Sequence, residues 1–308
     1  MLYQTLLSEI SKSFIGNEDV VKKIWMAILA KGHVLLEDIP GVGKTTLAKA
    51  FASALDLKVN RMQFSFDVLA SDVVGYKYID RYDGKEKMYY GAIFCNMFLA
   101  DELNRTSSKT QAALLEAMEE GTVSMEGTTL PLDDIFFVMA TQNPYGSAGT
   151  QMLPDSQRDR FMIGVSLGYP SKENEVKMLQ QKYHHVQNKV NKVIDKETLL
   201  KMQEEVKKVF IHPDIMNYIV SIIQEMRSYP AMVLKPSPRA SVALCSMAQA
   251  SAYLEQRDFV VVRDVLNVLE SVLNHRIILQ NTTPQSYQDM YKYVLAQVPQ
   301  PELGDIQC

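Results

Sequence analysis

The sequence has few cysteines and histidines, and their positions exclude two kinds of structural site. Its three cysteines, Cys95, Cys245 and Cys308, lie far apart among 308 residues. A disulfide framework or a CxxC metal site cannot be built from them. The five histidines include one adjacent pair, His184 and His185, which a helix would direct to different sides. We therefore expect neither a disulfide-stapled fold nor a His/Cys metal site.

Basic charge and long apolar runs are also lacking. Lys and Arg total 32 against 36 for Asp and Glu, a net charge of −4 that leaves no broad basic surface for a phosphate backbone. No stretch approaches the roughly 18 to 20 apolar residues that a membrane span needs. Residues 1–13 lack the basic start and apolar run of a signal peptide. These absences predict a cytoplasmic protein with no nucleic-acid partner and no direct membrane insertion.

The first half of the sequence alternates apolar runs with helical segments. The runs, bounded by turn residues, cover 33–37, 59–64, 93–100, 135–140 and 162–167. Such runs separated by helices predict a five-stranded parallel sheet covered on both faces, an αβα sandwich. Beyond residue 168 the apolar residues keep helical spacing, which predicts four to six helices and no sheet. We expect an α/β domain over 1–168 and an all-α domain over 169–308.

Two β-hairpins are predicted to interrupt the first domain. Aromatic and polar residues alternate over 76–90 on both sides of Asp83-Gly84, a pattern typical of a type I′ turn. A weaker pattern spans 123–130 around Glu126-Gly127. The first tip mixes both signs of charge and the second has no basic residue, so neither is suited to following a phosphate backbone.

The strongest motif is Asp38-Ile-Pro-Gly-Val-Gly-Lys-Thr-Thr46, between an apolar run and a helical segment at 47–55. Its glycines let successive N–H groups and the helix N-terminus face phosphate oxygens. Lys44 is predicted to reach the β and γ phosphates, and the Thr45 hydroxyl to ligate Mg²⁺. Asp38 replaces the first glycine of the P-loop pattern, and we expect it to be tolerated because Asp adopts positive φ more readily than most residues. The alternative is a helix capped by a glycine turn.

Polar residues follow two further apolar runs. After the first of these, Asp101 is predicted to hold Mg²⁺ through water, and Glu102 to polarise the water that attacks the γ-phosphate. Alone, this acidic pair could also be the first turn of a helix. Asn143, after the next run, could hydrogen-bond both the water and the γ-phosphate, the alternative being an Asx turn.

Three arginines are candidates for contacts with phosphate. Arg158 and Arg160 precede the fifth run, where they could form surface ion pairs or supply a trans-acting arginine finger. In the helical half, Ser237 and the proline after it predict an N-cap and the first position of a helix that runs to about residue 253. Arg239 then lies in the first turn, where the helix dipole disfavours a cation. A nearby anion such as the γ-phosphate would account for that placement.

In combination these motifs resemble an AAA+ ATPase module, and more closely a MoxR family ATPase. The matching stretches are 32–45, 99–106, 109–119, 140–144 and 237–240, within a resemblance that runs from about residue 14 to 279. It implies ATP and Mg²⁺ as ligands, and it assigns the finger to Arg160 with Arg158 as a substitute. The predicted nucleotide-binding residues are Gly41, Val42, Gly43, Lys44, Thr45, Thr46 and Asp101, with Thr45 and Asp101 as metal ligands. The predicted catalytic residues are Glu102, Lys44, Asn143, Arg160 and Arg239.

The resemblance also implies a ring, most simply a hexamer, with each nucleotide between two protomers. It implies an ATPase with a chaperone-like role, acting with a separate von Willebrand factor A domain protein in the maturation of metalloenzymes or other complexes. Both hairpins are similar to inserts that face the ring centre or a partner, which makes Tyr82 and Met125 candidate partner contacts. Two alternatives stay open: a nucleic-acid-dependent motor like the helicases and chelatases with the same inserts, and a nucleotide-gated assembly scaffold with slow hydrolysis.

Overall fold

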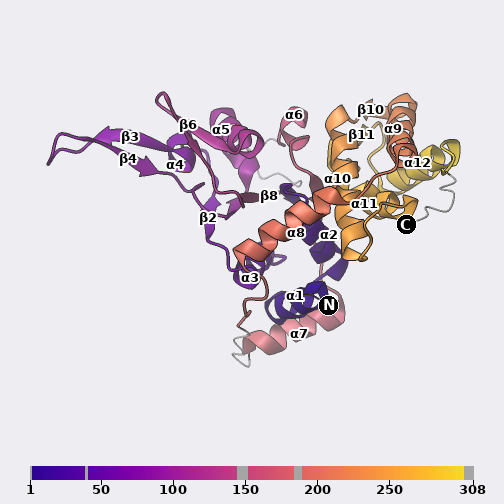
Figure 1. Ribbon diagram of the computed structural model, residues 1–308, viewed down its shortest axis with the longest axis horizontal. Coiled ribbons are helices and arrows are strands. Elements are labelled where there is room, and N and C mark those ends of the chain that lie inside the picture. The colour runs from indigo at the N-terminus through magenta and orange to yellow at the C-terminus, as the bar shows by residue number, and fades with distance from the viewer. Residues whose placement is uncertain (1, 39–40, 144–151, 184–188, 302–308) are drawn as a thin grey trace. The chain divides into compact units, whose positions relative to one another are not determined.

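The computed structural model describes residues 2–38, 41–143, 152–183 and 189–301 (Figure 1). These residues form two compact units. The first takes the described residues of 1–22, 33–160 and 165–200, and the second those of 23–32, 161–164 and 201–308. Residues 169–200 thus group with the first unit. The domain boundary at residue 168 stays a prediction.

A five-stranded sheet in the order β2-β5-β8-β1-β9 organises the first half of the chain. Its strands are β1 (Val34–Glu37), β2 (Val59–Gln63), β5 (Met97–Asp101), β8 (Phe137–Gln142) and β9 (Ile163–Val165). The pairings of β2 with β5, β5 with β8 and β8 with β1 are parallel. Every residue of β5 and β8 is buried, which requires cover on both faces of the sheet. The predicted α/β fold with a five-stranded parallel sheet is confirmed.

Helices precede, separate and follow these strands in the sequence. They are α1 (Leu2–Ser13), α2 (Glu18–Leu29), α3 (Lys44–Ala54), α4 (Ala70–Val74), η1 (Leu103–Arg105), α5 (Ser108–Glu120), α6 (Asp155–Arg158), α7 (Lys172–Tyr183) and α8 (Lys196–Lys208). Helix α3 packs against α1 and β5. The strand expected over 93–100 begins only at Met97, because the chain turns before it: Cys95 N donates to Ile93 O at 2.8 Å.

The first predicted hairpin is present, but its turn differs from the prediction. Strands β3 (Gly75–Ile79) and β4 (Glu86–Tyr90) pair antiparallel, and Figure 1 shows them extending away from α4. The last pair joins Ile79 to Glu86, which leaves a six-residue loop. Gly84 has a φ of +66°, whereas Asp83 is not among the described residues with positive φ. The type I′ turn predicted there is therefore wrong, since that turn needs positive φ at both positions.

The second hairpin contains the turn that was expected in the first. Strand β6 (Thr122–Met125) pairs antiparallel with β7 (Thr128–Pro131). The two residues between them, Glu126 and Gly127, have φ values of +44° and +81°. A two-residue connection with positive φ at both positions is the type I′ geometry.

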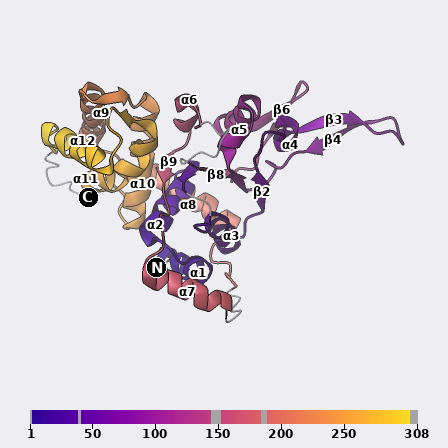
Figure 2. The same cartoon turned by 180° about the vertical axis from the view of Figure 1, so that it is seen from behind.

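The second unit is built from helices. They are α9 (Pro213–Ser228), α10 (Pro238–Leu254), α11 (Val262–Leu273), η2 (Asn274–Arg276) and α12 (Pro284–Gln297), and Figure 2 shows α9 to α12 gathered together. Helix α10 begins as predicted, with Ser237 Oγ accepting from Arg239 N at 3.0 Å. The helical lid is confirmed, although the expectation of no sheet misses a short antiparallel pair, β10 (Met232–Leu234) with β11 (Ile278–Leu279). Within the described parts of the chain, the helices lack the length and apolar character to cross a membrane.

A buried histidine ties α5 to the sheet and predicts acid sensitivity. His33 Nδ1 accepts from Val138 N at 3.0 Å, so Nε2 carries the ring hydrogen and donates to Met118 O at 3.1 Å. Burial lowers the pKa of His33 from 6.5 to about 4. The unfolded chain therefore binds a proton more readily than the folded chain between these values, and stability falls as pH drops below 6.5.

We expect the free energy of unfolding to fall by about 2 kcal/mol between pH 7 and pH 5 because of this one group. The measurement is urea unfolding followed by circular dichroism. In His33→Asn, which is less stable at pH 7, the pH-dependent loss should shrink by about that amount. An equal loss in both proteins would contradict the role given to His33.

Candidate active site

The phosphate-binding motif forms the connection from β1 to α3. Gly41 and Gly43 have φ values of +92° and +93°, a conformation that other L-residues rarely adopt. Helix α3 starts at Lys44, and no side chain caps its N-terminus. The N–H groups of its first turn, which includes Thr45 and Thr46, are therefore available to phosphate oxygens. Strand, glycine turn and helix occur in the predicted order.

Lys44 is a buried cation surrounded by oxygen atoms. Its Nζ donates to the main-chain oxygen of Asp38 at 3.0 Å, and only 9% of the residue is exposed. Burial lowers the pKa of Lys44, while the charges of Asp101, Asp38 and Glu102 act in the opposite direction. The charges that act on Lys44 thus include those of Asp101, the predicted metal ligand, and Glu102, the predicted catalytic residue. A desolvated cation gains more from a phosphate than an exposed one does.

Asp38 does not behave as the sequence predicts. It is not among the described residues with positive φ, so backbone tolerance is not the reason that it can replace glycine. Instead its carboxylate accepts from Leu167 N at 2.6 Å, Ser166 Oγ at 2.7 Å and Gly168 N at 3.2 Å. The side chain is buried and satisfied by groups about 130 residues further along the chain.

The acidic pair lies at the carboxyl end of β5. Asp101 Oδ1 accepts from Thr141 Oγ1 at 2.7 Å, and the same hydroxyl oxygen accepts from Glu102 N at 2.8 Å. Glu102 adopts a φ of +56°, which turns the chain out of the strand at this point. Its carboxylate pairs with Arg105 at 2.6 Å. Thr141, wholly buried on β8, thus fixes both acidic residues.

Three contacts of this cluster are missed by sequence reasoning. Thr141 is a fully buried polar side chain in β8, and nothing in the sequence separates it from other threonines in strands. Arg61 on β2 donates to Asp101 Oδ2 at 2.8 Å. Arg105 follows Glu102 by three residues, the spacing of an ion pair along a helical turn. Neither arginine belongs to a motif that names it.

Three further predicted residues are described by their positions in the fold and by their ion pairs. Asn143 directly follows β8, the strand between β1 and β5, so it leaves the sheet at the edge that carries Lys44 and Asp101. Arg160 donates to Glu119 of α5, and its side chain is 31% exposed. Arg158 pairs with Asp155, and its side chain is 10% exposed. Only Arg160 of the two has a side chain open enough to reach a neighbouring molecule.

Arg239 lies in the second unit, in the first turn of α10. Its predicted position is confirmed within that unit. Its role toward the γ-phosphate stays a prediction.

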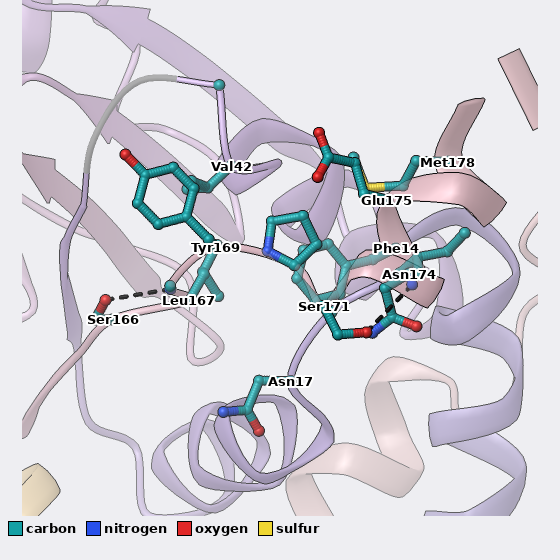
Figure 3. Close-up of a pocket in the computed structure, with 15 residues that line it drawn as sticks. Phe14, Asn17, Val42, Ser166, Leu167, Tyr169, Ser171, Asn174, Glu175 and Met178 are labelled. Atoms are coloured by element: carbon teal, nitrogen blue, oxygen red, sulfur yellow. Dashed lines mark hydrogen bonds between the residues drawn. The ribbon is translucent and has the colours of Figure 1, made fainter.

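A cavity of about 580 Å³ adjoins the phosphate-binding turn within the first unit. Gly41 and Val42 form one side, and the connection after β9 together with α7 forms the other. Figure 3 shows the ring of Tyr169 beside Val42, with Phe14, Met178 and Glu175 further along the wall. The volume falls in the range of small-molecule sites, and a wall of apolar side chains with a few polar groups is typical of them.

The residues present suit a nucleotide with its magnesium ion. Asp101 and the Thr45 hydroxyl are the hard oxygen donors that Mg²⁺ prefers. In the described residues, no three His, Cys, Asp or Glu side chains gather in an arrangement that could hold a metal by themselves. Mg²⁺ at phosphate sites is usually held by one or two protein oxygens together with substrate phosphates. Bound there, the ion would neutralise charge on the β and γ phosphates.

Comparison with known proteins gives the same assignment. Residues 33–163 match the family described as "ATPase family associated with various cellular activities (AAA)", and residues 224–291 match the AAA lid domain. YeaC of Bacillus subtilis (strain 168), itself uncharacterised, is 45% identical over 278 residues, which cover 89% of this chain and 86% of YeaC. The protein named Chaperone MoxR1 of Mycobacterium tuberculosis is 34% identical over 282 residues, 88% of this chain and 74% of that protein.

A solved structure extends the agreement to the fold. The crystal structure of a candidate ATPase from Cytophaga hutchinsonii superposes with a TM-score of 0.88 at 32% identity, covering 98% of this chain and 95% of that one. The resemblance seen in the sequence is confirmed: the chain belongs to the MoxR family of AAA+ ATPases.

Proposed function

We propose that this protein hydrolyses Mg²⁺-ATP and uses the cycle to remodel protein complexes. One observation carries the ATPase part: Lys44, at the uncapped start of α3 after β1, and the acidic pair that Thr141 holds at the end of β5 leave the same edge of the parallel sheet. Lys44 grips the β and γ phosphates, Thr45 and Asp101 hold the metal, and Glu102 polarises the attacking water. The cavity beyond Gly41 and Val42 receives the base and ribose.

The nucleotide-binding groups act in a ring, most simply a hexamer, in which Arg160 of one protomer reaches the γ-phosphate of the next. Asn143 positions the water, and Arg239 senses the γ-phosphate from the lid. The exposed fraction of the Arg160 side chain supports the first of these roles. The family supports the ring, the two other roles and a location in the cytoplasm.

The client of the ATPase is a protein complex, and the partner is a von Willebrand factor A domain protein that assists in the maturation of metalloenzymes or other complexes. A relative that carries the name chaperone supports this, and so does the β3–β4 hairpin. Tyr82 at its tip is fully exposed, and Ile79 is 72% exposed. Exposed aromatic and aliphatic side chains on a projecting element are typical of protein contacts.

The charges of the hairpin argue against a nucleic-acid motor. Two of its four basic side chains form ion pairs: Lys87 with Asp80 and Asp83, and Lys77 with Glu86. The other two, Arg81 and Lys85, alternate with these carboxylates along the tip. Basic side chains that are already neutralised by neighbouring carboxylates contribute little to phosphate binding. The second hairpin, β6–β7, contains no basic residue.

The experiment measures ATP hydrolysis by the purified protein alone and with single- or double-stranded DNA or RNA, at low and high salt. We expect hydrolysis that needs Mg²⁺ and that nucleic acid does not stimulate, even at low salt where electrostatic attraction is least screened. Stimulation by DNA that falls steeply with salt would favour the helicase-like alternative. Slow hydrolysis that neither DNA nor a partner changes would favour the assembly scaffold.

Partner binding is tested with Glu102→Gln, which holds its ATP state. This protein should retain a von Willebrand factor A domain protein or a client complex from cell extract, and adding Tyr82→Ala should weaken that retention at least several-fold. Tyr183→Ala on α7, where the tyrosine is 75% exposed, is the matched control. Met125 is not a usable probe, because it is 3% exposed and its sulfur lies close to Gly75. Equal retention by the Tyr82 and Tyr183 variants would remove the hairpin from the interface.

A further inference from the structure

One buried carboxylate joins two walls of the cavity. Asp38 directly follows β1, where the phosphate-binding turn begins. Its carboxylate accepts three hydrogen bonds from donors in the segment 166–168. Only 5% of Asp38 is exposed. Hydrogen bonds to an ionised acceptor in such a place are about twice as strong as neutral ones. A glycine at this position, as in the usual P-loop pattern, would make none of them.

The segment that Asp38 holds, here called the connector, also has one buried apolar side chain, that of Leu167. It runs from β9 to α7, and it turns at Gly168, whose φ of +67° only glycine adopts easily. An added Cβ at Gly168 would meet nothing within 4 Å, so the positive φ and not a close contact favours glycine there. Gly168 N also donates to Ser166 Oγ at 3.2 Å, a bond drawn in Figure 3.

The same residue also touches the phosphate-binding machinery. The main-chain oxygen of Asp38 accepts from Lys44 Nζ at 3.0 Å, while its side chain holds the connector. Gly41 and Val42 of the turn line the cavity, and so do Ser166, Leu167 and Gly168 of the connector. One side chain thus links the two segments that contribute these two parts of the lining.

We propose that Asp38 is a positioning residue that fixes the connector at a set distance from the phosphate-binding turn, so that a ligand with a phosphate end and a base end meets both walls at once. The inference rests on the proposed binding of ATP in this cavity. Linked contacts reinforce each other only when their spacing is fixed beforehand, because ordering a loose wall costs free energy on binding. A ligand fragment that contacts only one wall gains no affinity from the spacing that Asp38 fixes.

The experiment compares Asp38→Gly, which restores the usual P-loop glycine, and Ser166→Ala with the unmodified protein. The dissociation constants of ATP, tripolyphosphate and adenosine are measured by displacement of a fluorescent ADP analogue whose own affinity is determined for each variant. We expect ATP to bind about 10-fold more weakly to Asp38→Gly and about 3-fold more weakly to Ser166→Ala. Tripolyphosphate and adenosine should each change by less than about 2-fold.

Two further readouts separate this role from a merely structural one. In steady-state hydrolysis, Asp38→Gly should raise KM for ATP by about the same factor while kcat changes less than about 2-fold, as expected when uniform binding is lost. Adding Ser166→Ala to Asp38→Gly should have almost no further effect, because the hydroxyl acts through the missing carboxylate. Thermal unfolding of each variant checks that it is folded.

The outcomes are distinct. If Asp38→Gly binds tripolyphosphate more weakly by the same factor as ATP, Asp38 only shapes the phosphate-binding turn and the inference is overturned. If ATP binding is unchanged in both variants, the tether has no role in binding and the inference also fails. If the unmodified protein binds no ATP at all, the proposed function itself is wrong. If Asp38→Gly does not fold, Ser166→Ala decides by the same comparison of ATP with its fragments.

Discussion

Replacing Glu102 with glutamine is expected to lower ATP turnover by about 100-fold or more while ATP still binds. The carboxylate follows β5 and is carried by a backbone of positive φ that Thr141 fixes through the Glu102 N–H. Glutamine keeps the size of the side chain, but its amide is a far weaker base, and general-base catalysis contributes about 10² to 10⁴ in rate. The phosphate contacts of Lys44 do not depend on that charge.

Lys44→Ala should give the opposite pattern, with ATP binding weakened by about 100-fold or more. This change removes the buried cation that donates to the main-chain oxygen of Asp38. Two measurements on both variants distinguish these roles. Equilibrium binding of a fluorescent nucleotide reports phosphate binding, and release of phosphate reports activation of the attacking water. Glu120→Gln, at the exposed end of α5, is the matched control for the charge change. Tight ATP binding by Lys44→Ala, or substantial turnover by Glu102→Gln, contradicts these roles.

The sheet and the phosphate-binding motif could be predicted because their signals are local. An apolar run between turn residues identifies a strand by itself, and a glycine turn before a helix identifies an anion site by itself. The order of strands along the chain then brings Lys44 and Asp101 to one edge, since β1, β5 and β8 are parallel neighbours. The lid was predictable for the same reason, from helical spacing.

The parts that could not be predicted depend on residues far apart in the sequence. Thr141 meets Asp101 across 40 positions, and Asp38 meets Leu167 across 129. No local pattern distinguishes a threonine that holds a catalytic strand end from any other strand threonine. In the case of Asp38, backbone preference suggested tolerance of positive φ, whereas the tertiary contacts of its carboxylate explain its place. The type I′ turn was predicted for the first hairpin from the composition of its tip, whereas strand pairing sets the length of the loop.

Arg160→Ala is expected to lose about 10³-fold or more in turnover while still binding nucleotide, if its guanidinium acts on the nucleotide of a neighbouring protomer. In the structure Arg160 donates to Glu119 of its own chain, from a side chain that is 31% exposed. An exposed ion pair of this kind contributes about 1 kcal/mol or less to stability. Arg160 can therefore leave Glu119 for the phosphate of a neighbouring protomer at little cost. Arg158→Ala is the control, since that side chain is nearly buried against Asp155 and should affect stability more than turnover.

Mixing decides whether Arg160 acts between protomers. An Arg160→Ala protomer keeps an intact nucleotide pocket, and a Lys44→Ala protomer keeps an intact arginine. Where the first supplies the pocket and the second supplies the arginine, one complete site forms, so a mixture should recover part of the activity that both variants lack alone. Activity per protomer of the unmodified protein should also rise with concentration as rings assemble. If crosslinking shows that mixed rings form and no activity returns, Arg160 acts within its own chain or only holds α5 in place.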